Sequence, residues 1–209
     1  MNQINNGAFI FNSVADSSTP FLNQVINWFV FKNSELPPIM RTDKALKYFK
    51  LTQYFAELFS KDPSTKVGVL FLDPVSYDIL SQGYNGMARG VDETIASRWE
   101  RPIKYLYVEH AERNGMYNAI RKGISLAGAI ALITLFPCAD CARGLIQVGI
   151  ETIVCPKPPP ELVERWGTSF EVAQAMLAEA GVQIQYVEDL QDEQDLMVLS
   201  NTLDESPKA

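Results

Sequence analysis

Residues 110–141 read HAERNGMYNAIRKGISLAGAIALITLFPCADC, and this stretch decides the fold. It opens on His110, the single histidine of the chain, and it closes on the cysteine pair Cys138 and Cys141. The spacing of 28 residues from His110 to Cys138 leaves room for one helix, a turn and one strand. We expect the helix to run to about Lys122, with Gly123 at its C-terminal cap, and the strand to cover residues 129–136.

The residue types at the two ends of this stretch are those of a catalytic zinc site. Catalytic zinc takes three protein ligands and leaves a fourth position open for water, whose pKa it lowers to about 7. His110, Cys138 and Cys141 would supply the three ligands, because cysteines three apart at the start of a helix share one face. A helix N-terminus also favours the thiolate that binds metal. Glu112 lies roughly 200° around the helix from His110, so we assign it to proton transfer and not to ligation.

The cysteine pair taken alone has two other interpretations. A C-x-x-C pair alone also occurs in structural zinc sites and in redox sites. A structural zinc site would need a fourth protein ligand, and the one remaining thiol, Cys155, is more typical of a buried apolar position at a strand end. The combination H-x-E with P-C-x-x-C is instead typical of zinc-dependent nucleobase deaminases.

Composition limits the class of protein and of ligand. A chain of 209 residues can bury one sizeable core. Three cysteines do not make a disulfide framework, which favours a reducing cytoplasm. The net charge of -7 argues against a long nucleic acid as substrate but not against a nucleotide. We find no secretory signal, and the apolar stretch 21–31 is too short and too polar to span a membrane.

We expect three regions along the chain. Residues 1–40 form an N-terminal extension, residues 41–187 the catalytic domain, and residues 188–209 an acidic tail that frays at its end. Within the extension, four apolar residues could form one helix face that packs either on its own domain or on another subunit: Phe21, Val25, Trp28 and Phe29.

The pattern of the domain predicts alternating helices and strands after an initial hairpin, and hence a mixed three-layer α/β fold. We expect a long loop from Gly86 to Tyr107 that is functional or carries its own short helix, and a rigid proline loop over 156–160. The expected helices cover 42–59, 110–122, 139–148 and 169–180, and the expected strands cover 67–72, 79–83, 129–136, 152–155 and 182–186.

Four strings of residues carry a resemblance to a known family. They are KDPSTKVG at 61–68, GYNGM at 83–87, HAE at 110–112 and FPCADCA at 136–142. In type and in order they resemble the cytidine and deoxycytidylate deaminase superfamily, most of all its deoxycytidylate (dCMP) deaminase branch, over residues 45–187. The resemblance implies a three-layer α/β/α cytidine-deaminase-like fold with a five-stranded mixed sheet. It also implies zinc-dependent hydrolysis of the 4-amino group of dCMP to give dUMP and ammonia.

The resemblance also suggests substrate-binding residues. Asn85 matches the family asparagine that holds the sugar, although it could instead be a turn residue. Lys66 is a candidate phosphate contact or else a solvated charge at a strand end. Ala111 and Arg113 complete the candidate set, and Arg113 could instead be a surface charge.

Three departures from the family pattern widen the choice of substrate. Arg113 stands where leucine is usual, Ala88 where proline is usual, and Glu109 where cysteine is common. These changes leave zinc hydrolysis intact. They leave open the choice among dCMP, dCTP and a free nucleoside, so a bifunctional dCMP/dCTP deaminase or another cytosine nucleoside or nucleotide deaminase is the alternative.

Regulation and assembly follow from the resemblance alone. Members of this branch are often homo-oligomers, typically hexamers, that dCTP activates and dTTP inhibits. The effector site includes the GYNG loop, which here means Gly83, Tyr84 and Gly86, and a nucleotide triphosphate effector would bring Mg²⁺. A polynucleotide or tRNA deaminase is disfavoured by the acidic charge, and a zinc-folded regulatory subunit without turnover is disfavoured by the intact Glu112.

Overall fold

The computed structural model describes residues 39–194. The predicted helix face in residues 1–38 and most of the predicted acidic tail lie outside this range. The described elements are α2 (Thr42–Phe59), β1 (Gly68–Leu72), β2 (Ile79–Tyr84), β3 (Gly86–Met87), η1 (Ala96–Trp99), α3 (Lys104–Tyr107), β4 (Val108–Glu109), α4 (Ala111–Lys122), β5 (Ile130–Ile133), α5 (Ala139–Gln147), β6 (Thr152–Cys155), α6 (Pro160–Glu179) and β7 (Gln183–Tyr186).

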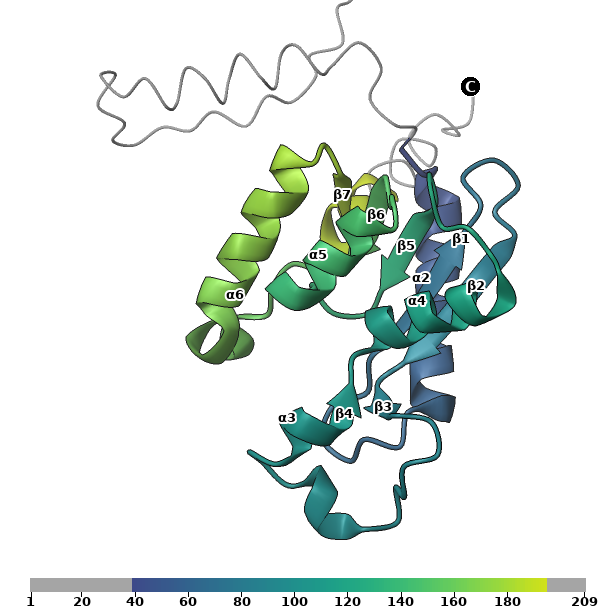
Figure 1. The fold of residues 1–209 in the computed structure, drawn as a ribbon. Helices are drawn as coiled ribbons and strands as arrows, with labels where there is room; N and C mark the ends of the chain where they lie inside the picture. The colour runs from purple at the N-terminus through teal and green to yellow at the C-terminus, as the bar shows by residue number, and fades with distance from the viewer. Residues whose placement is uncertain (1–38, 195–209) are drawn as a thin grey trace, which may run out of the picture. The chain divides into compact units, whose positions relative to one another are not determined.

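Within residues 39–194, five strands form one mixed sheet in the order β2-β1-β5-β6-β7 (Figure 1). Strand β1 pairs antiparallel with β2 and with β5, whereas β5, β6 and β7 are parallel neighbours. The two parallel connections need a crossover, which α5 and α6 supply. The predicted five-stranded mixed sheet with flanking helices is therefore confirmed.

Helices cover both faces of this sheet and create two apolar cores. Val69 and Phe71 of β1 point into the core beneath α4, α5 and α6, whereas Leu70 and Leu72 point into the core beneath α2. This division follows from the alternation of side chains along a strand. Strands β1 and β5 are buried along their whole length, which explains their continuous apolar sequences.

The predicted boundaries hold for most elements but not for α6. This helix begins at Pro160, nine residues before the predicted start at Ser169, because a proline suits the first helical position, where no amide hydrogen bond is needed. The strand predicted at 129–136 is shorter and covers Ile130–Ile133. Residues 187–194 are helical, and Val187 and Leu190 are buried in the core beneath α2.

The long connection before the histidine carries short elements of its own, as predicted. Residues 88–107, which we call the 88–107 segment, contain η1 and α3. The segment is closed at its base by the short antiparallel pair β3–β4, and it lies at one end of the sheet in Figure 1. None of the helices in residues 39–194 has the length and apolar character needed to cross a membrane.

Candidate active site

The ends of two helices bring the predicted metal ligands together. His110 and Cys138 have extended backbones immediately before α4 and α5, and their carbonyls accept the first hydrogen bonds of these helices. Cys141 lies in the first turn of α5. Among residues 39–194, these three form the one group of potential metal ligands, with ligand atoms within 4.8 Å of one another.

The donor chemistry of this group fits zinc. His110 Nδ1 lies 3.5 Å from Cys138 Sγ and 3.4 Å from Cys141 Sγ. A hydrogen bond from the Cys141 thiol, with further help from His110, lowers the pKa of Cys138 to about 4. One imidazole and two thiol groups with an open fourth direction form the usual ligand set of a catalytic zinc in deaminases.

Glu112 is buried beside these ligands, with 4% of its surface exposed. Burial raises the pKa of its carboxyl above the usual value, while the neighbouring His110 partly offsets this effect. A carboxyl group whose pKa is shifted towards neutrality can both accept and return a proton. Glu112 therefore suits the predicted role of proton carrier.

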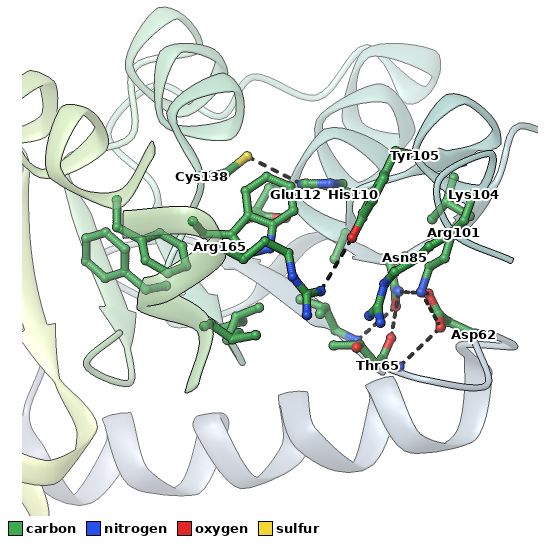
Figure 2. A pocket seen from close by; sticks show the side chains of 18 residues that line it. Asp62, Thr65, Asn85, Arg101, Lys104, Tyr105, His110, Glu112, Cys138 and Arg165 are labelled. Carbon is green, nitrogen blue, oxygen red and sulfur yellow. Dashed lines mark hydrogen bonds and ion pairs between the residues drawn. The ribbon is translucent and has the colours of Figure 1, made fainter. Parts of the chain in front are cut away.

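A cavity opens directly above the ligand group (Figure 2). His110, Glu112 and Cys138 form its floor, and its walls come from the turn before β1, from the 88–107 segment and from α6. The aromatic wall includes Trp166, whose ring meets that of His110 edge-on at 6.5 Å and that of Tyr105 at 5.9 Å. The cavity can hold a planar base against the metal ligands.

Sequence comparison agrees with this geometry. A family model described as the cytidine and deoxycytidylate deaminase zinc-binding region matches residues 42–157, which is more than half of the chain. This chain belongs to that family. Its reaction class is therefore hydrolytic deamination, and the match includes all three metal ligands and Glu112.

Individual relatives support the same assignment. A deaminase of uncharacterised role from Aliivibrio fischeri is 37% identical over 143 residues, covering 68% of this chain and 92% of that protein. The deoxycytidylate deaminase of Mus musculus is 33% identical over 114 residues, covering 52% of this chain and 62% of that protein. The fold resembles that of a dCMP deaminase from the cyanophage S-TIM5, solved with dCMP and dUMP, with a TM-score of 0.57 and 22% identity over 71% of this chain and 99% of the other.

In this deaminase, Asn85 lines the cavity, but its side-chain amide is fully engaged within the protein. Its Oδ1 accepts hydrogen bonds from the Ser60 hydroxyl (2.7 Å) and from the Val67 amide (2.8 Å). Its Nδ2 donates to Asp62 (3.0 Å) and to the carbonyl of Thr65 (2.8 Å). These four bonds use both amide hydrogens and both lone pairs of the oxygen. Asn85 thus holds the cavity wall together, and a direct contact with a sugar would need one of these bonds to break.

The two cations predicted beside the substrate do not line the cavity. The Lys66 ammonium bonds to the side chain (3.0 Å) and the carbonyl (2.9 Å) of Glu57 on α2. The Arg113 guanidinium bonds to Glu109, one helical turn earlier. Both cations thus have carboxylate partners of their own. Ala111, the remaining candidate, is buried and does line the cavity.

The structure adds cavity residues that were not predicted. Arg101, Lys104 and Tyr105 come from the 88–107 segment, and Arg165 and Trp166 come from α6. The expectation that the long loop is functional pointed to the first group without naming residues. The second group was missed because the predicted helix began only at Ser169, beyond Arg165 and Trp166.

The residues of the GYNG string divide between two roles. Tyr84 and Gly86 line a second cavity, but Gly83 does not. Gly83 packs instead against the backbone of α4 at Ala111 and Gly115, where an added Cβ would collide. Its lack of a side chain lets the helix that begins after His110 approach the sheet closely.

Proposed function

We propose that this deaminase hydrolyses dCMP to dUMP and ammonia with a zinc ion held by His110, Cys138 and Cys141. The observation that supports a nucleotide substrate is the charge of the cavity above this site. In a chain with a net charge of -7, the cavity is lined by Arg101 and Arg165, whose guanidinium groups reach into it in Figure 2. A 5′-phosphate gains charge-assisted hydrogen bonds from such groups.

The residues on the cavity floor have separable tasks in this reaction. Bound zinc supplies the Lewis acidity that activates water. Glu112 accepts one proton from the water as its oxygen adds to C4, and delivers that proton to ring nitrogen N3. It then carries the remaining proton of the C4 hydroxyl to the 4-amino nitrogen, so that the C4–N bond breaks, ammonia leaves and the C4 carbonyl of dUMP forms. Trp166 and Tyr105 flank the space for the pyrimidine and keep bulk water away from it.

A comparison of turnover on four substrates tests this proposal. Purified protein is incubated separately with dCMP, deoxycytidine, CMP and dCTP, and the loss of cytosine absorbance is followed. We expect kcat/KM for dCMP to exceed that for deoxycytidine by more than about tenfold, because a charge-assisted hydrogen bond contributes about 1.5–3 kcal/mol. Equal values for the two substrates would contradict the nucleotide assignment.

A bifunctional dCMP/dCTP deaminase is the second candidate. Arg101 and Arg165 are exposed at the mouth of the cavity, so additional phosphates could extend into solvent. Turnover of dCTP at a rate comparable to that of dCMP would favour this alternative. Selective turnover of dCMP would favour the first.

We also propose that the second cavity holds a nucleotide triphosphate effector together with Mg²⁺. Tyr84 and Gly86 line it, and it is rich in cationic side chains, which suit a polyphosphate. The cations that line it are Lys61, Arg89, Arg121 and Lys122. We expect dCTP with Mg²⁺ to activate and dTTP to inhibit dCMP turnover. Rates that are unchanged by either nucleotide over the millimolar range would contradict this role.

The exposed face of α2 supports assembly into a homo-oligomer, for which we propose a hexamer. Leu51, Tyr54 and Leu58 recur at helical spacing on this face, and their exposed fractions range from 43% to 63%. Large contiguous apolar surfaces typically mark sites of protein association. Size-exclusion chromatography coupled to light scattering should give a molar mass about six times the chain mass of 23.4 kDa. A monomer would contradict the proposal.

A reducing cytoplasm is the proposed location. Cys138 and Cys141 must remain thiols to bind metal, and Cys155 is buried without a disulfide partner among the described residues. Fractionation that places the protein in an oxidising compartment would contradict this. A polynucleotide partner is not part of the proposal, because the chain is acidic.

A further inference from the structure

We propose that Arg101 and Arg165 together bind the 5′-phosphate of the substrate, and that Lys104 is the residue that positions Arg101 and Tyr105 for this task. The inference rests on the proposed deamination of dCMP. It goes further by assigning phosphate recognition to named residues from two separate parts of the fold. These are the 88–107 segment and α6, which both line the cavity.

The cationic side chains in the cavity are not equivalent. Lys104 Nζ lies 2.8 Å from Asp62 Oδ1, 2.6 Å from Asp62 Oδ2 and 2.7 Å from Ser64 Oγ. These contacts occupy the ammonium, and its charge is balanced by Asp62. Lys104 therefore has little left to offer an anionic ligand.

Arg101 and Arg165 keep their donors available. The Arg165 guanidinium has one hydrogen bond, to the Tyr105 hydroxyl, at the long distance of 3.5 Å. Within residues 39–194, the Arg101 guanidinium has no hydrogen bond or ion pair to another side chain. A phosphate dianion at the mouth of the cavity would therefore meet two guanidinium groups, each able to donate two parallel hydrogen bonds. The cytosine ring would then extend inward towards Glu112.

Lys104 fixes the part of the 88–107 segment from which these contacts come. Its side chain is 7% exposed and that of Asp62 is 1% exposed, so the pair is sealed within the protein. Asp62 is itself held by the amides of Ser64 and Thr65. The ion pair therefore attaches the segment to the turn before β1. Because Arg101 lies three residues before Lys104 and Tyr105 follows it directly, this attachment sets where both side chains enter the cavity.

The connection continues across the cavity to α6. The Tyr105 hydroxyl accepts the hydrogen bond from Arg165, and the Tyr105 ring meets Trp166 edge-on (Figure 2). Displacing the 88–107 segment would thus disturb both arginines. Lys104 is a positioning residue in this scheme, whereas the two arginines touch the substrate.

The ratio of kcat/KM for dCMP to that for deoxycytidine tests the arginine assignment. Arg101→Gln and Arg165→Gln should each lower this ratio by about 10- to 100-fold, as expected for loss of a charge-assisted hydrogen bond. Arg98→Gln is the matched control, because Arg98 lies in the same segment but stacks on Tyr107 outside the cavity. A ratio that stays at the wild-type value in both cavity variants, or that falls equally in Arg98→Gln, would overturn the assignment.

Binding of the product gives a second measurement that does not depend on turnover. Calorimetric titration should show that wild-type protein binds dUMP more tightly than deoxyuridine, and that Arg165→Gln reduces the difference. The proposed function and this inference fail on different results. The proposed function fails if the wild-type enzyme has equal kcat/KM values for dCMP and deoxycytidine. If the wild type prefers dCMP and both arginine variants keep that preference, only the arginine assignment fails.

A double-mutant comparison of Lys104 with Arg165 tests the positioning role of Lys104. In Lys104→Met the loss should appear mainly in KM for dCMP, and the double variant with Arg165→Gln should lose less than the product of the single losses. Losses that simply multiply would overturn the positioning role. Tyr105→Phe removes the hydroxyl bond without disturbing the ion pair and should lower the dCMP ratio by about two- to tenfold. An unchanged ratio in that variant would show that the link to α6 does not contribute.

Discussion

Lys104→Met probes the buried ion pair through the free energy of unfolding. The substitution keeps an unbranched side chain but removes the ammonium that lies 2.6 Å from Asp62. Removing one partner of a buried ion pair usually costs about 3–5 kcal/mol, because the other charge stays buried and unpaired. Asp62 retains its hydrogen bonds from Ser64, Thr65 and Asn85, so we expect a loss near the lower end, about 3 kcal/mol.

The same pair predicts how the loss depends on pH. Burial by itself would raise the pKa of Asp62, but the hydrogen bond from Lys104 and those from the Ser64 and Thr65 amides together hold it below its ordinary value. A carboxyl group whose pKa is lowered by folding stabilises the protein above its unfolded pKa, and this stability disappears as the pH falls through the folded value. In Lys104→Met the pKa of Asp62 should rise. The difference between wild type and variant should therefore be largest near pH 7 and should shrink as the pH falls through the raised pKa of the variant towards about pH 4.

Urea denaturation at pH 7 and at pH 4 gives the free energy of unfolding from the midpoint and the slope of the transition. Comparing wild type with Lys104→Met at the two pH values therefore measures the loss of stability and its pH dependence. Lys61→Met is a suitable control, because Lys61 pairs with Glu93 on an exposed surface, where an ion pair contributes little to stability. Its midpoint should match that of the wild type. A loss below about 1 kcal/mol for Lys104→Met at pH 7, or a loss that grows towards pH 4, would refute the reasoning.

Four further predictions concern the active site and its supports. Cys138→Ser should lose zinc and activity together, measured by metal analysis and by dCMP turnover; a zinc-free yet active variant would contradict the ligand assignment. Glu112→Gln should keep its zinc but lose about 10²- to 10⁴-fold in kcat, and a wild-type kcat would exclude it as the proton carrier. Asn85→Ala should lower the free energy of unfolding by about 1–3 kcal/mol, because it leaves buried hydrogen-bonding partners unpaired; an unchanged urea midpoint would count against this. Gly83→Ala should cost a similar amount, about 1–3 kcal/mol, because its Cβ would meet the carbonyl of Ala111, and kcat should fall with it; unchanged stability would show that α4 can shift freely.

The features that could be predicted from the sequence are those set by local spacing. Cysteines three apart at a helix start share a face wherever that helix lies, so Cys138 and Cys141 were identifiable before their partner was placed. The same holds for β1, whose alternate residues supply the two cores, and for Gly123, whose left-handed backbone ends α4 at the predicted position. In each case the residues that decide the feature lie within a few positions of one another in the sequence.

Side-chain direction at the cavity could not be predicted in this way. Lys66 precedes Val67, which lines the cavity, but neighbouring residues of an extended chain point to opposite sides, and Lys66 meets Glu57 instead. Arg113 follows Glu112, yet one helical position turns it towards Glu109. Closeness to a motif in sequence thus selected two cations that do not line the cavity. Both have a carboxylate partner that only the folded structure reveals.

The location of the arginines explains why the sequence motif specifies the reaction more firmly than the substrate. The metal ligands and Glu112 lie within the matched zinc-binding region, whereas Arg165 lies on α6 beyond its end at residue 157. Arg101 lies inside that region, but on the 88–107 segment that projects from one end of the sheet. Substitutions on these two parts can change the charge at the mouth of the cavity without moving the ligand triad, since the triad is fixed by α4, α5 and the sheet beneath them. On the proposed assignment of Arg101 and Arg165, substrate choice in this deaminase depends on the contact between the 88–107 segment and α6 beside the cavity. The Lys104–Asp62 ion pair fixes the 88–107 segment at this contact.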